Sequence, residues 1–138
     1  MHARWQALLD ATRSAADGSW ELDRLIWAVR RGHCDGPDLP HYVDDYWEEA
    51  CREGGQWCST KMEDAVAMLD ELAEGCDLTL SRSPAGWTAE AVHPGFGLSF
   101  RSEAPRPTAA LAVVEAAVML RGPWNEKQLE SWSASPDT

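Results

Sequence analysis

A group of thiols and imidazoles near the middle of the chain is the first place where chemistry could reside. Cys34, Cys51 and Cys58, together with His33 or His41, could supply the ligands of a zinc ion. Zinc ligands usually come in pairs two to four residues apart, because one short loop must present both of them. Only the adjacent His33 and Cys34 approach this spacing, and neighbouring residues rarely point at one metal. We therefore expect free thiols that behave as small buried hydrophobes, with no metal and no cofactor.

Paired carboxylates form the second such group. Asp44-Asp45 and Glu48-Glu49 could hold Mg²⁺ or Ca²⁺ through hard oxygen ligands, although no EF-hand loop surrounds them. A solvated acidic face is the alternative. With Trp47 as an apolar anchor, these four carboxylates could also bind a basic partner protein. The sequence has no phosphate loop, GxSxG or HExxH motif, so we expect no enzymatic activity.

A third set combines cations with an aromatic ring. Trp87 follows a predicted turn and could stack on a flat ligand while neighbouring cations pair with an anion. The alternative places the ring in the core with phenylalanines of the same segment. The predicted ligand-binding residues are Trp87, Arg82, Arg101, His93 and Arg106.

Composition limits the class of protein to which these residues belong. The chain has 138 residues, 44% of them hydrophobic, and 12 basic against 23 acidic residues give a net charge of −11. We expect one globular protein that neither wraps nucleic acid nor adheres to an anionic membrane. No apolar run reaches the roughly 20 residues of a spanning helix, and the N-terminus lacks a signal-peptide core, so we expect a cytoplasmic protein.

The acidic excess is confined to two segments. Residues 35–53 hold seven acids and one arginine, and residues 60–77 hold six acids and one lysine. Residues 78–121 carry four arginines against three glutamates. An anion could therefore approach segment 78–121 without first meeting the acidic surfaces.

Hydrophobic periodicity predicts the elements that must position these residues. Helical spacing favours helices over 3–16, 19–32, 61–74 and 109–121. Thr60-Lys61-Met62-Glu63 has the pattern of a capping box at the start of the third. Alternating residues favour strands over 76–82, 87–91 and 96–101, joined by short turns.

The predicted fold class is α+β: an antiparallel three-stranded meander packed against helices, or α/β sandwich. We expect helices on the apolar face of the sheet and leave the polar face open. The alanine-rich helix 109–121 is apolar on nearly all sides, so it lies either in the centre of the core or in a homodimer interface. Residues 1–121 form the predicted domain, with an acidic, aromatic insertion at 33–56 that could hold a short helix. Residues 122–138 form a flexible or partner-docking tail.

Several packing and capping motifs occur in a recognisable order. They are Glu21-Leu22-Asp23, Ser59 to Val66, Gly86-Trp87, and Thr108 to Ala112. In this order the chain resembles the phage ABA sandwich domain family over about residues 19–32 and 57–121. The resemblance implies a small phage protein of the host bacterial cytoplasm, with an α/β sandwich and no established catalytic residues. The insertion and the tail depart from the family pattern.

Three functional hypotheses follow. The first is a non-catalytic phage-type protein that sequesters a small anionic aromatic ligand, for example a nucleotide signal of bacterial antiphage defence. The second is an acidic inhibitor that imitates nucleic-acid charge and docks on a basic host protein. One continuous face of carboxylates would support this hypothesis. The third is a structural or accessory phage domain that self-associates.

Overall fold

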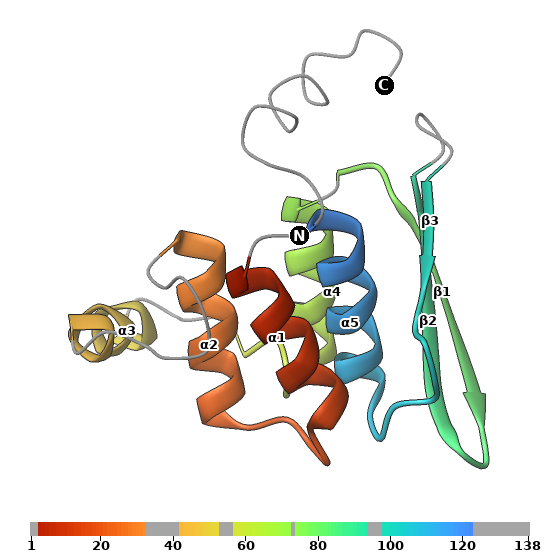
Figure 1. Ribbon diagram of the computed structural model, residues 1–138, viewed down its shortest axis with the longest axis horizontal. Helices are drawn as coiled ribbons and strands as arrows, with labels where there is room; N and C mark the ends of the chain where they lie inside the picture. The colour runs from red at the N-terminus through yellow and green to blue at the C-terminus, as the bar shows by residue number, and fades with distance from the viewer. Residues whose placement is uncertain (1–2, 33–41, 53–56, 73, 94–97, 123–138) are drawn as a thin grey trace, which may run out of the picture.

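The computed structural model describes residues 3–32, 42–52, 57–72, 74–93 and 98–122 (Figure 1). His33, Cys34, His41, Phe96 and the predicted tail beyond residue 122 lie outside the described residues. The elements follow the order α1 (Ala3–Ser14), α2 (Trp20–Arg31), α3 (Tyr42–Arg52), α4 (Met62–Leu72), β1 (Asp77–Ser83), β2 (Gly86–His93), β3 (Leu98–Arg101) and α5 (Ala109–Arg121). The predicted α+β class is confirmed.

The three strands form one antiparallel sheet in the order β1-β2-β3. Side chains alternate between its two faces. Ala89 and Ala91 on the inner face are fully buried, whereas Thr79 and Ser81 on the outer face are exposed. In Figure 1 the described helices all lie on one side of the sheet. The outer, polar face carries no described helix. The strand alternation alone had left the covering of this face undecided.

Helix α5 occupies the centre of the molecule, between the sheet on one side and α1 and α4 on the other (Figure 1). Leu111, Val114 and Val118 are fully buried, and the alanines between them are also buried within a single copy of the chain. Small side chains let the neighbouring helices approach closely. The core alternative for this apolar helix is therefore the one observed.

Two of the predicted helix caps form as expected. The hydroxyl of Ser19 accepts from the amide of Leu22 at 3.1 Å, and that of Thr108 accepts from Leu111 at 3.2 Å. Gly32 ends α2 in the left-handed conformation, with φ of 73°, which glycine adopts without steric cost.

The prediction of a capping box at Thr60 is wrong. The Thr60 hydroxyl instead donates to the buried carboxylate of Asp23 on α2 at 3.2 Å. The carboxylate of Asp64 accepts from the amide of Trp57 at 2.9 Å. A tertiary acceptor therefore outcompetes the local cap.

The described part of the insertion is a regular helix, α3, that packs against α2. Trp47 is 0% exposed and lies with its ring centroid 5.6–6.1 Å from those of Trp20, Trp27 and Trp57. Edge-to-face tryptophan packing anchors α3. No helix in the described part of the chain is long and apolar enough to cross a membrane.

Candidate anion-binding site

A hollow lies at the end of the outer sheet face where β1, β2 and β3 meet the chain that leads into α5. Its volume is about 460 Å³, and it is lined by Ser81, Arg82, Ser83, Thr88, Arg101 and segment 102–105. We call it the outer-sheet hollow. A smaller recess of about 140 Å³ adjoins it and adds Thr79 and Glu90. Ser81, Thr88 and Arg101 line both.

A bulge in the sheet forms one wall of the outer-sheet hollow. The amide of Ser102 donates to the carbonyl of Ala89 at 2.9 Å, and Arg106 then exchanges both backbone hydrogen bonds with Trp87. Between these two pairs, β2 contributes only Thr88, whereas the facing chain contributes residues 103–105. Bulges of this kind occur often beside functional sites because they redirect side chains out of the regular pleat.

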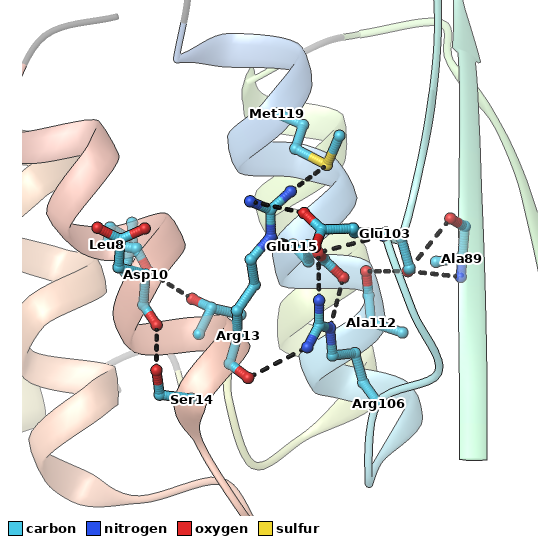
Figure 2. Close-up of polar contacts among 12 residues, drawn as sticks. Leu8, Asp10, Arg13, Ser14, Ala89, Glu103, Arg106, Ala112, Glu115 and Met119 are labelled. Carbon is cyan, nitrogen blue, oxygen red and sulfur yellow. Dashed lines mark hydrogen bonds and ion pairs between the residues drawn. The ribbon is translucent and has the colours of Figure 1, made fainter. Parts of the chain in front are cut away.

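A buried carboxylate holds this bulge in place from the inner side (Figure 2). Glu115 on α5 is 0% exposed and accepts from Arg106 Nε at 2.7 Å and Arg13 Nε at 2.8 Å. It also accepts from the backbone amide of Glu103 within the bulge at 3.3 Å. Burial would raise the pKa of Glu115, but the hydrogen bonds from Arg106 and Arg13 outweigh it and lower that pKa below its usual value.

The two arginines of this network connect separate parts of the fold. Arg106 donates through its Nη1 to the carbonyl of Arg13 at 3.1 Å, so it also satisfies the C-terminal end of α1. Arg13 reaches outward to the carboxylate of Glu103 at 3.0 Å. The pKa of Arg106 is raised by its hydrogen bond to Glu115. Helices α1 and α5 and the bulge thus share one ion network, which we call the Glu115 network (Arg13, Glu103, Arg106 and Glu115).

The arginine on the outer face is not neutralised by the fold. Arg101 is exposed and forms no ion pair with a carboxylate of the described residues. Arg82 is the register partner of Trp87 and shares its face of the sheet, where its guanidinium lies 5.6 Å from the centroid of the Trp87 ring. Ser81 and Thr88 make no side-chain hydrogen bond to any described residue. Donors for an oxyanion are therefore available at this surface.

The structure separates the five predicted ligand-binding residues. Arg101 lies on the outer face at the hollow, whereas Arg82 lies over the ring of Trp87, which is half-buried and packs against the core on the other face. His93 is buried, and Arg106 is buried and committed to Glu115. The prediction that these five residues form one site is thus corrected, because the pleat directs alternate residues to opposite faces.

The predicted partner-binding residues of α3 are also divided. Asp44, Asp45, Glu48 and Glu49 are exposed, with Asp44 paired to Arg24 of α2 and Glu48 to Arg52 at 3.9 Å. Trp47 is fully buried, so it anchors α3 and presents no surface to a partner. The exposed aromatic residues here are Trp20 and Tyr46, with 48% and 50% exposure. Sequence alone could not tell which aromatic side of α3 faces α2.

The three thiols in the described regions all have raised pKa values. Burial raises the pKa of Cys58 to about 12 and that of Cys76 to about 11, and it also raises the pKa of Cys51. Within the described ranges no three histidine, cysteine or carboxylate residues gather as metal ligands would. Three members of the zinc set considered from sequence, Cys34, His33 and His41, fall outside those ranges.

Sequence reasoning missed the two groups that shape the hollow. Arg13 and Glu115 are 102 positions apart, and nothing local indicates that they pair. The only signal was a single carboxylate in an otherwise apolar helix, since such a residue is buried only with charged partners. The hydroxyls of Ser81 and Thr88 were treated as the polar half of a strand pattern.

Comparison of the chain with protein-family models found no match, and neither a curated protein nor a solved structure matches it. The resemblance to the phage ABA sandwich family therefore stays a prediction from the sequence motifs.

Proposed function

We propose that this protein binds a small anion in the outer-sheet hollow without transforming it. The observation that supports the proposal is the exposed Arg101 in an open hollow, with no carboxylate of the described residues bound to it. An arginine left unpaired beside unused hydroxyls is well suited to an oxyanion, because guanidinium donors match its geometry.

The distribution of charge supports the same proposal. The acidic helix α3 lies at the opposite end of the molecule from the sheet (Figure 1). The two glutamates near the hollow are Glu103, which is paired with Arg13, and Glu90. An approaching anion therefore meets the uncompensated Arg101, and Glu90 is the unpaired carboxylate near it.

The proposal keeps the anionic part of the first sequence hypothesis and gives up ring stacking on Trp87. That ring packs against the core and has Arg82 over it. Sequestration of a defence signal by a phage protein rests on the sequence resemblance, and the geometry adds nothing to it.

Calorimetric titration with a panel of small anions tests the proposal. The panel includes inorganic phosphate, ribose 5-phosphate and AMP, and the variants are Arg101→Gln and Arg31→Gln. Arg31 is an exposed α2 arginine with no ion pair to any described residue, so it is the matched control for overall charge. We expect Arg101→Gln to weaken binding by roughly ten- to a hundredfold and Arg31→Gln to have little effect. No binding by any anion, or equal losses in both variants, would contradict the proposal.

A second candidate function is docking of α3 on a basic partner protein. Trp20 and Tyr46 are exposed near the carboxylates of Asp45, Glu48 and Glu49, and exposed aromatics ringed by charge are typical of interaction surfaces. Ion pairs of Arg24 with Asp44 and of Arg30 with Glu71 place cations of α2 beside both acidic segments. A partner would thus meet a mixed surface on this side, unlike a pure phosphate mimic. Association with a purified basic nuclease, lost in Tyr46→Ala and at high salt, would be the expected result, and no association at low salt would refute it.

A further inference from the structure

The composition of the outer-sheet hollow and its adjoining recess restricts the chemical class of the ligand. No aromatic residue of the described chain lines either cavity. The polar residues of the lining are arginines, several hydroxyl side chains and two glutamates, and the short Ala104-Pro105 segment adds apolar surface. A nucleobase binds such surfaces mainly by stacking on an aromatic ring, and these walls offer none.

The position of Glu90 is not explained by a site that binds only an anion. It lines the recess together with Arg101 and stands opposite Arg101 in the β2–β3 register. Nevertheless it forms no ion pair with Arg101 or with any other cation of the described residues. A carboxylate accepts hydrogen bonds and donates none when ionised, so it would repel an oxyanion and bind a hydroxyl group.

Two cavities that share Arg101 can accommodate a ligand with two different ends. The larger one presents Arg101, which donates to an anion. The smaller one presents Glu90 and Thr79, which accept from hydroxyl groups. Ser81 and Thr88 line both and can donate or accept.

We propose that the ligand is a phosphorylated polyhydroxy compound of the sugar phosphate class, with its phosphate at Arg101 and its hydroxyl groups at Glu90. This inference rests on the proposed anion-binding function and names the ligand of the same site. It assigns Glu90 as a specificity-determining residue for the hydroxyl-bearing end.

Matched ligands distinguish this class from its alternatives in calorimetric titrations of the wild-type protein. Ribose 5-phosphate adds a sugar to the phosphate group, and AMP adds a base to ribose 5-phosphate. We expect ribose 5-phosphate to bind at least tenfold more tightly than inorganic phosphate, and AMP to bind no more tightly than ribose 5-phosphate. Equal affinity for inorganic phosphate and ribose 5-phosphate would overturn the inference, as would AMP binding tenfold more tightly than ribose 5-phosphate.

The Glu90→Gln variant gives an independent test. Glutamine keeps the size of the side chain and removes its charge. The variant should weaken binding of ribose 5-phosphate about tenfold, while inorganic phosphate binds as well as before or better, because a repulsive charge has gone. A merely structural role for Glu90 would lower both affinities together and would overturn the assignment. If no anion binds the wild-type protein at all, the proposed function itself fails, which is a distinguishable result.

Discussion

At the scale of single residues, the side chain of Glu115 connects α5 to α1 and to the sheet bulge. Its carboxylate is buried and accepts hydrogen bonds from two guanidiniums and one backbone amide. Breaking a buried ion pair by removing one charge leaves the partners uncompensated, which costs more than the pair contributed. Replacing the Glu115 side chain alone should therefore change the stability of the protein measurably.

Glu115→Gln should lower the free energy of unfolding by about 3 kcal/mol. Glu63→Gln on α4, which changes an exposed carboxylate with no ion pair to a described residue, should change it by less than about 0.5 kcal/mol. Urea denaturation of both variants at neutral pH measures the difference. Similar small losses in both would contradict the role assigned to the Glu115 network.

The difference in stability between the wild-type protein and Glu115→Gln should depend on pH. In the folded protein the pKa of Glu115 lies below its usual 4.5. Its contribution to stability is therefore present above about pH 4.5 and is lost as the pH falls through the folded-state value. The stability gap between wild type and Glu115→Gln should shrink with acidification over this window. A gap that stays constant to the lowest pH at which both fold would contradict the lowered pKa.

At the scale of elements, the sheet bulge is the feature that converts a plain meander into a cavity. Gly86 begins β2 with φ of 136°, and a Cβ there would lie 2.4 Å from the carbonyl oxygen of Arg106. The close approach lets Arg106 pair with Trp87 and so closes the bulge. Glycine is required at this position by both its φ and its lack of a side chain.

Gly86→Ala tests this requirement, with Gly75→Ala as its control. Gly75 also has a positive φ, of 85°, but a Cβ there would meet nothing within 4 Å. We expect Gly75→Ala to cost about 1 kcal/mol of stability from backbone strain alone. Gly86→Ala should cost roughly 3 kcal/mol and should also weaken anion binding. Equal costs in thermal denaturation would show that the Gly86–Arg106 contact is not tight.

Elements were predicted well where one local pattern decides them. The alternation in 76–101 defined a sheet with one apolar face, and Ser19 and Thr108 indicated where α2 and α5 begin. The capping box at Thr60 failed because the acceptor that its hydroxyl uses, Asp23, belongs to another helix. The candidate site was only partly predictable for the same reason: Arg101 comes from the strand pattern, whereas the bulge depends on Glu115 and Arg13.

For the whole molecule, charge is divided between two ends. Helix α3 and the sheet are separated by α2, α1 and α5 in Figure 1. Exposed charges further apart than a Debye length, about 8 Å at physiological salt, interact little. The net charge of −11 therefore says little about what the sheet face can bind.

Neutralising α3 should leave the sheet site unchanged. In the double variant Glu48→Gln/Glu49→Gln, the affinity for ribose 5-phosphate should stay within about twofold of wild type at physiological salt. The single variant Glu90→Gln, which removes less charge, should change it more. An α3 variant with the larger effect would show that overall charge and not local geometry governs binding.

The most direct measurement is a map of backbone amide chemical shifts during titration with ribose 5-phosphate. The account predicts that the largest changes fall on Ser81, Thr88 and Arg101 and on Glu103 and Ala104, with α3 unaffected. Arg101→Gln should abolish this pattern at the same ligand concentration, and Arg31→Gln should keep it. Changes concentrated on α2 and α3, or none at saturating ligand, would contradict the assignment of the outer-sheet hollow as the binding site.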